Sequence, residues 1–152
     1  MQTSKDTTTS VLRITRTFPA KRERVFDAMT KPDQLAQWWG PAGFSLPTAE
    51  LDLRVGGKYR FKMQPPQGQA MMLSGTFKEI DRPSKLAYTW AWEGAPETLV
   101  TIELKEAEGD TEVVLTHEPF PSAELVAQHD AGWQGGFERL EEILRRERAS
   151  RR

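Results

Sequence analysis

Residues 122–147 read SAELVAQHDAGWQGGFERLEEILRRE and contain the most regular helical pattern of the chain. Large side chains recur there at three- and four-residue steps, which places them along one side of an α-helix. Ser122 is a favourable N-cap, because its hydroxyl can accept a hydrogen bond from the first turn. We therefore predict a helix of about 25 residues, about 37 Å long. Its apolar side carries Leu125, His129, Trp133, Phe137, Leu140 and Leu144.

Shorter stretches before this helix alternate apolar and polar residues with a period of two, which is typical of half-buried β-strands. The clearest is a hairpin around Gly56-Gly57, in which we assign Leu53 and Val55 to the apolar face. Residues 20–30 and 32–39 instead have helical spacing, and Pro32 separates them. The predicted strands are residues 10–18, 50–55, 58–63, 71–77, 86–92, 100–105 and 113–117.

These elements predict an α+β fold. Consecutive strands joined by short turns pair antiparallel, and an apolar face on every strand requires a cover on one side of the sheet. We predict a curved antiparallel sheet wrapped around the long C-terminal helix, with two short helices after the first strand. A single domain is expected over residues 10–148, with a turn at 40–43 inside it. A flexible tail at 1–9 precedes the domain and a basic tail at 149–152 follows it.

The composition excludes several classes of function. The chain has no Cys and only two His, which excludes disulfides and Cys-ligated zinc, and we expect neither a metal nor a cofactor. A net charge of -1 with interspersed signs argues against a nucleic-acid surface. Residues 1–10 lack the apolar run of a signal peptide, and no stretch approaches a membrane span, so we expect a cytoplasmic protein without membrane insertion.

Aromatic residues gather on the predicted apolar face of the sheet, opposite glycines in the long helix. Each of Gly132, Gly135 and Gly136 costs about 1 kcal/mol in a helix interior relative to Ala. Either the helix packs closely at these glycines, or the missing side chains leave space for a ligand. Three more rings crowd a Gly/Pro loop at one end of the sheet, which favours a binding site. The rings are Tyr59, Phe61, Phe77, Tyr88, Trp90 and Trp92 on the sheet and Trp38, Trp39 and Phe44 near the loop.

Both histidines are predicted to face the interior. His117 has the inward phase of Val113 and Leu115, and His129 lies on the apolar side of the long helix. Either could bind a ligand or transfer a proton near neutral pH. The alternative is that both are structural, with hydrogen bonds to protein groups.

Several motifs in a fixed order give the chain a family resemblance over residues 11–147. It resembles the helix-grip fold of the START/polyketide-cyclase (SRPBCC) superfamily. Within that superfamily it is similar to bacterial homologues of the heat-shock protein 90 ATPase activators, of the C-terminal domain type. The resemblance implies a deep cavity between sheet and long helix for hydrophobic ligands such as lipids. The motifs are Trp38-Trp39-Gly40-Pro41, Gly43-Phe44, Asp52, Arg54, Gly56-Gly57, Tyr59, Pro83, Leu86, Tyr88, Trp90, His129, Gly132-Trp133 and Leu140.

The leading hypothesis is a binding module for an apolar or aromatic small molecule resembling a lipid, a polyketide or an aromatic metabolite. Two alternatives stay open: a cyclase- or hydrolase-type enzyme that uses a pocket histidine, and a partner of a chaperone ATPase. A homodimer also stays open, and no catalytic residue is assigned. The predicted ligand-binding residues are Trp38, Trp39, Phe44, Tyr59, Phe61, Phe77, Tyr88, Trp90, His117, His129 and Trp133.

Overall fold

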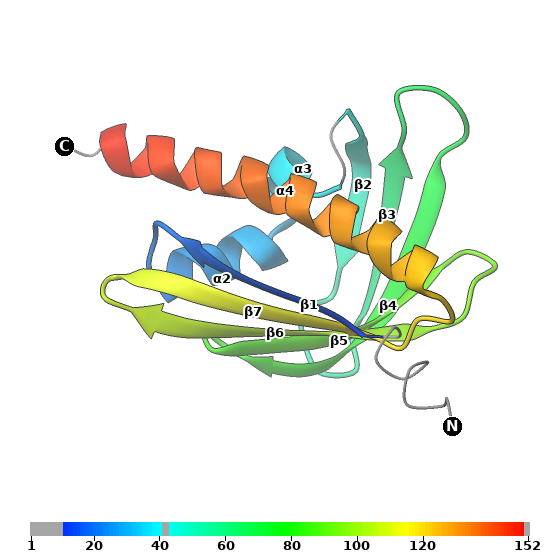
Figure 1. Cartoon of the computed structure of the whole chain (residues 1–152), viewed down its shortest axis with the longest axis horizontal. Coiled ribbons are helices and arrows are strands. Elements are labelled where there is room, and N and C mark those ends of the chain that lie inside the picture. Colours follow the sequence, from blue (N-terminus) through cyan, green and yellow to red (C-terminus); the bar gives the residue numbers. More distant parts are fainter. Residues whose placement is uncertain (1–10, 41–42, 151–152) are drawn as a thin grey trace.

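The computed structural model describes residues 11–40 and 43–150, and within them one antiparallel sheet with the strand order β1-β7-β6-β5-β4-β3-β2. The sheet is strongly curved: β2 and β3 stand steeply to β6 and β7 (Figure 1). The predicted tail at 1–9, residues 41–42 of the predicted turn and residues 151–152 lie outside the described part. The strands are β1 (Leu12–Phe18), β2 (Ser45–Leu51), β3 (Lys58–Gln64), β4 (Met71–Asp81), β5 (Lys85–Trp92), β6 (Thr98–Ala107) and β7 (Asp110–Glu118).

The helices cover one face of this sheet. After β1 come α2 (Arg22–Thr30) and α3 (Pro32–Trp38), and the 28-residue α4 (Ala123–Ser150) crosses the sheet (Figure 1). At the start of α4 the Oγ of Ser122 accepts a hydrogen bond from the backbone N–H of Leu125, at 3.2 Å. The α+β helix-grip fold and the capped long helix predicted from the sequence are therefore confirmed. No helix of the described residues is both long enough and apolar enough to cross a membrane.

The first strand of the predicted hairpin is wrong in its position. Strand β2 ends at Leu51, and Leu53 and Val55 are 39% and 61% exposed instead of lying on the apolar face. After Leu51 the backbone forms a turn instead of continuing the strand. This turn bonds to β4, where the N–H of Gly56 donates to the carbonyl of Phe77, at 2.8 Å. The apolar–polar alternation thus continues into a turn, where it no longer reports a buried face.

The outer side of β5 also differs from the predicted alternation, because Ala87 and Thr89 are buried. Thr89 is held by hydrogen bonds to residues of β3 and β4. The Tyr59 hydroxyl donates to the Thr89 carbonyl at 2.6 Å, and the Thr89 Oγ1 accepts from the backbone N–H of Thr76 at 2.8 Å. A Cβ on Gly75 would lie 2.5 Å from the Tyr59 ring, so glycine is required where this ring crosses β4.

The interior beneath the C-terminal half of α4 is filled. Phe137 is fully buried and meets Phe18 of β1 edge to face, with ring centroids 5.3 Å apart. Ion pairs fix the flanks of this half: Arg16 to Glu141 at 2.9 Å and Arg24 to Glu147 at 2.7 Å. Further fully or almost fully buried side chains at this end are Val25, Phe26, Leu140 and Leu144.

Candidate functional site

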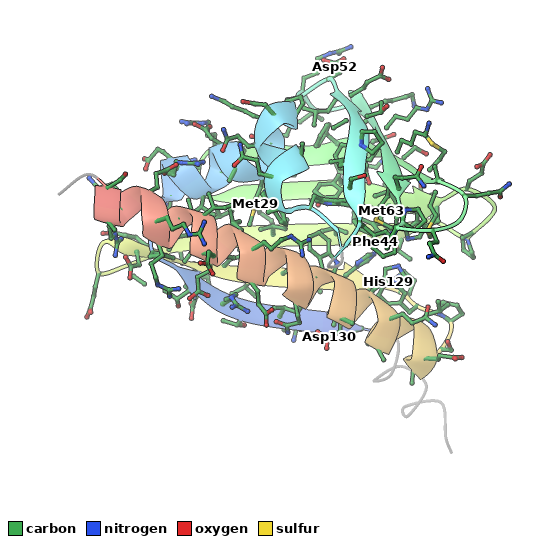
Figure 2. All side chains as sticks on the ribbon, turned by 90° about the horizontal axis from the view of Figure 1, so that it is seen from above. Met29, Phe44, Asp52, Met63, His129 and Asp130 are labelled. Carbon is green, nitrogen blue, oxygen red and sulfur yellow. The ribbon has the colours of Figure 1, made fainter. Side chains whose placement is uncertain are left out.

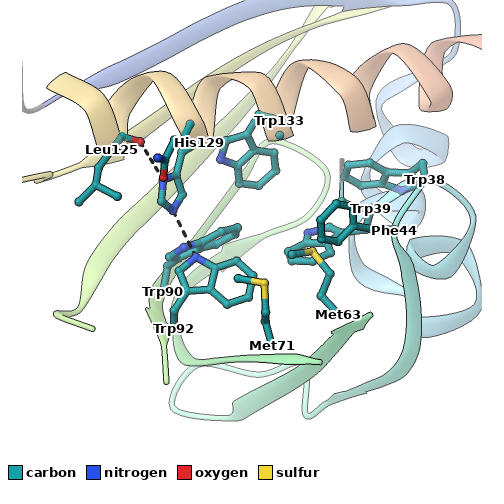
Figure 3. A pocket seen from close by; sticks show the side chains of 13 residues that line it. Trp38, Trp39, Phe44, Met63, Met71, Trp90, Trp92, Leu125, His129 and Trp133 are labelled. Atoms are coloured by element: carbon teal, nitrogen blue, oxygen red, sulfur yellow. Dashed lines mark hydrogen bonds between the residues drawn. The ribbon is translucent and has the colours of Figure 1, made fainter. Parts of the chain in front are cut away.

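A cavity of about 410 Å³ lies beneath the N-terminal half of α4, against β3, β4, β5 and the end of α3 (Figure 3). All five tryptophans of the sequence line it. Seen from above, Phe44 and Met63 lie near His129, whereas Met29 lies farther along the helix (Figure 2). The lining residues are Trp38, Trp39, Gly40, Phe44, Met63, Met71, Trp90, Trp92, Leu125, Gln128, His129, Gly132 and Trp133.

The end of α3 forms one wall of the cavity and is held rigidly. The Nε1–H of Trp38 donates to the carbonyl of Ala28 in α2, at 2.9 Å. Arg139 of α4 donates to the carbonyls of Trp38, the last residue of α3, and of Gly40 just beyond it. The ring of Trp39 contacts Trp90, with centroids 5.8 Å apart. This wall is therefore fixed to α2 and α4 before any ligand binds.

The glycines of α4 serve both purposes considered from the sequence. A Cβ on Gly136 would lie 3.1 Å from the Trp38 carbonyl oxygen, so this glycine allows close helix packing. Gly132, one turn earlier, lines the cavity. One glycine brings the helix close to α3, and the other leaves room beneath the helix.

His117 is a structural residue with no exposed surface. The Thr98 hydroxyl donates its proton to the carbonyl of Trp90, so its Oγ1 must accept from the Nε2–H of His117, at 2.8 Å. The other ring nitrogen, Nδ1, accepts from the Nε1–H of Trp133 at 3.2 Å. Burial, and then the neighbouring His129, lower the pKa of His117 to about 3. The imidazole is therefore neutral, and both nitrogens bind protein groups.

His129 lies on the cavity wall, and its hydrogen bonds define its tautomer. A carbonyl can only accept, so Nδ1–H donates to the carbonyl of Leu125, at 2.9 Å. An indole can only donate, so Nε2 accepts from the Nε1–H of Trp92, at 3.2 Å. Burial lowers the pKa of His129, although its hydrogen bond to Leu125 acts in the opposite direction. A neutral imidazole results.

Trp90 stands at the centre of the ring cluster. Its centroid is 5.3 Å from that of Trp133, 5.7 Å from that of Trp92 and 4.8 Å from that of His117. Its Nε1–H is buried and has no hydrogen-bond partner within residues 11–40 and 43–150. An unsatisfied buried N–H costs about 1–3 kcal/mol. Because this nitrogen is itself covered, Trp90 contributes its ring, and not its N–H, to the cavity wall.

The structure places six of the predicted site residues on the cavity wall and five elsewhere. His117 lies behind the wall, bonded to Thr98 and Trp133. The other four rings surround a separate space of about 20 Å³, with room for about one water molecule. They pack on one another, with Tyr59 and Phe61 centroids 4.9 Å apart, and burial raises the pKa of both tyrosines. These four are Tyr59, Phe61, Phe77 and Tyr88; the six on the wall are Trp38, Trp39, Phe44, Trp90, His129 and Trp133.

Some lining residues were absent from the predicted set. Met63, Met71 and Trp92 have the inward phase of their strands, and Leu125 lies on the apolar side of α4, so the periodicity contained their direction. Gly40 and Gln128 carry no such signal, whereas Gly132 is one of the helix glycines that the sequence offers as space for a ligand. Periodicity shows which residues face inward, but not where along each strand the covering helices end and the cavity begins.

The cavity wall is largely apolar, and none of its described residues carries a formal charge. Its polar side chains are Gln128 and the neutral His129, whose Nε2 accepts from the indole N–H of Trp92. Within the described ranges, no three His, Asp or Glu side chains come together as metal ligands. The wall therefore suits neutral, apolar or aromatic molecules and offers no counter-charge to an ion.

Solved structures with the same fold include several bacterial proteins. Protein CV1439 from Chromobacterium violaceum has a TM-score of 0.83 and 28% identity, over 89% of this chain and 96% of that chain. The AHSA1 (SPO3351) protein from Silicibacter pomeroyi has a TM-score of 0.79 and 27% identity, over 91% and 99% of the two chains. Protein NE0264 from Nitrosomonas europaea has a TM-score of 0.79 and 25% identity, over 93% and 97%. A comparison with curated proteins found no match.

A family model covers most of the chain. The model of the Activator of Hsp90 ATPase homolog 1-like proteins matches residues 19–145. These residues include α2, α3, β2–β7 and most of α4, and so the whole wall of the cavity. The resemblance stated from the sequence motifs is confirmed. The chain belongs to the family of Activator of Hsp90 ATPase homolog 1-like proteins.

Proposed function

We propose that the protein binds one neutral apolar or aromatic small molecule in the tryptophan-lined cavity. The observation that carries this proposal is a space of about 410 Å³ walled by all five tryptophans of the chain, with no charged side chain among the lining residues that the structure describes. This volume is in the lower part of the range of small-molecule sites. It suits a compact molecule of a few rings or a single short chain better than a lipid with two long chains.

The hydrogen bonds of the two histidines favour binding over catalysis. A general acid or base needs a nitrogen that can reach the substrate. His117 has no exposed surface and both of its nitrogens bind protein groups, and burial lowers the pKa of His129, which makes its Nε2 a weak base. The proposal is therefore a carrier or sensor, with the enzyme alternative ranked below it.

Filling the cavity tests the proposal directly. Gly132→Leu should abolish binding of aminoanthracene, a neutral aromatic probe, because the new side chain points into the space beside Trp133. Folding should be retained, because leucine forms helices better than glycine by about 1 kcal/mol. Isothermal titration calorimetry measures the binding, and thermal unfolding measures the stability.

Ala131→Leu is the matched control, because Ala131 is exposed on the same turn of α4. It should bind the probe as the unmodified protein does. Equal binding by the Gly132→Leu variant would show that ligands enter elsewhere, and absence of probe binding to the unmodified protein would contradict the proposal.

The chaperone alternative concerns a surface contact and is tested separately. The family description names activation of the Hsp90 ATPase. The measurement is ATP hydrolysis by a bacterial Hsp90 with and without this protein, and with the Gly132→Leu variant. Stimulation that survives in the variant would assign a second role, independent of the cavity.

A further inference from the structure

Two residues of the cavity wall, His129 and Trp92, form a polar pair within an otherwise apolar surface. Trp92 lies at the end of β5 and His129 on the second turn of α4, so the pair bridges sheet and helix (Figure 3). The indole Nε1 and the imidazole Nε2 are 3.2 Å apart, at the long end of the range for an N–H donor. Both side chains are only partly buried. The bond is therefore weak and accessible from the cavity.

The roles of the two nitrogens are fixed. Leu125 holds the proton of His129 on Nδ1, which leaves Nε2 as an acceptor, and Trp92 Nε1–H is a permanent donor. A hydroxyl group combines one donor with acceptor lone pairs, so it can satisfy both nitrogens at once. Two bonds of about 2.8 Å at a tetrahedral oxygen need nitrogens about 4.6 Å apart, so the rings must separate by about 1.4 Å.

Trp92 is held to β4 through its backbone, so the separation requires a rotation of its partly buried side chain. It is the last residue of β5, and the following residues 93–97 are exposed. The rings beside it remain to hold the rest of a ligand: the centroids of Trp90 and Trp39 lie 5.7 Å and 6.4 Å from that of Trp92.

We propose that His129 and Trp92 form a hydroxyl-binding subsite, which selects neutral aromatic ligands that carry a phenol or alcohol group. The proposal rests on the proposed binding function and specifies its ligand class. The hydroxyl donates to His129 Nε2 and accepts from Trp92 Nε1–H, replacing one long hydrogen bond with two. A carboxylate is rejected, because none of the described lining residues is a cation and a buried unpaired anion is costly.

The test uses a series of naphthalenes substituted at one ring carbon: naphthol, methoxynaphthalene, methylnaphthalene and naphthoate. Naphthol can donate and accept, the methoxy compound can only accept, and the methyl compound can do neither. Calorimetry should show naphthol binding about tenfold tighter than methylnaphthalene, with methoxynaphthalene close to the methyl compound and naphthoate not bound. Equal affinities for naphthol and methylnaphthalene would overturn the subsite and leave the proposed function intact. Failure of every neutral naphthalene to bind would overturn both.

Two variants locate the preference. Trp92→Phe keeps an aromatic ring and loses the donor, and His129→Phe loses the acceptor. In each, the preference for naphthol over methylnaphthalene should fall from about tenfold to less than about twofold.

Trp133→Phe is the matched control, because Trp133 also lines the cavity but its N–H is bonded to His117. It should keep the naphthol preference. Loss of the preference in all three variants would assign it to the cavity as a whole and overturn the subsite. Circular dichroism of each variant checks that the comparison is made between folded proteins.

Discussion

The two halves of α4 cover the same sheet, yet one end of the interior is filled and the other is hollow. Under the C-terminal half, Phe137 and Leu144 reach the sheet and have at most 1% of their surface exposed. Under the N-terminal half, Leu125 is partly buried and Gly132 has no side chain to offer. Apolar rings line both ends, so the difference lies in the cover. Stability is thus expected to reside at one end and binding at the other.

Shortening a leucine at each end gives the largest expected contrast. Leu144→Ala should lower the free energy of unfolding by about 2–5 kcal/mol, because it empties a filled site. Leu125→Ala should cost less than about 1 kcal/mol, because that side chain already borders empty space. Urea denaturation measures both. Similar losses for the two variants would mean that the hollow end contributes to stability as the filled end does.

Acid should act through His117, which lies behind the cavity wall. The pKa of His117 is lowered from 6.5 to about 3 in the folded protein, so between these values the unfolded chain binds more protons. The free energy of unfolding therefore keeps the full contribution of neutral His117 above about pH 6.5 and falls as the pH decreases towards 3. The expected loss between pH 7 and pH 5 is about 2 kcal/mol. The lowered pKa of His129 acts in the same direction.

Denaturation at a series of pH values measures this loss. His117→Gln removes the ionising group and keeps a donor and an acceptor, so its stability should vary less with pH over this range. An equally steep loss in that variant would assign the acid sensitivity to other residues.

The same substitution one helical turn apart gives the smallest contrast. Gly132→Ala should stabilise the protein by about 1 kcal/mol, because alanine favours the helix and its methyl group enters the cavity. Gly136→Ala gains the same propensity, but its Cβ would lie 3.1 Å from the Trp38 carbonyl oxygen, which Arg139 holds in place. In thermal unfolding, the Gly136→Ala variant should be at least about 1 kcal/mol less stable than the Gly132→Ala variant. Equal gains would show that α3 can move away from α4.

Periodicity predicted the fold well because it reports which face of an element is buried. It failed at Leu53 and Val55, where alternation runs on into a turn that bonds to β4. Tertiary hydrogen bonds, which no local pattern contains, decide where that strand ends.

The site was predicted less completely than the fold. The local sequence shows which face of a strand a side chain is on, but not what that side chain meets in the interior. Tyr59 and Met63 share one face of β3, yet Tyr59 reaches across Gly75 to Thr89 and Met63 borders the cavity. The two histidines show the same limit of the prediction. The sequence pattern predicts that both face inward, but only His129 lies on the cavity wall. The difference depends on where α3 and α4 end above each strand, which is a property of the assembled fold.

The distribution of the indoles has an optical consequence. Because every tryptophan of the chain lines the same space, emission from these residues reports mainly the end of the molecule that holds the cavity. A melting curve followed by that emission records the separation of the first half of α4 from β3–β5, whereas far-ultraviolet dichroism records the whole backbone. On heating, a gap between the two curves would measure how much earlier the hollow end opens, without a label or an added dye.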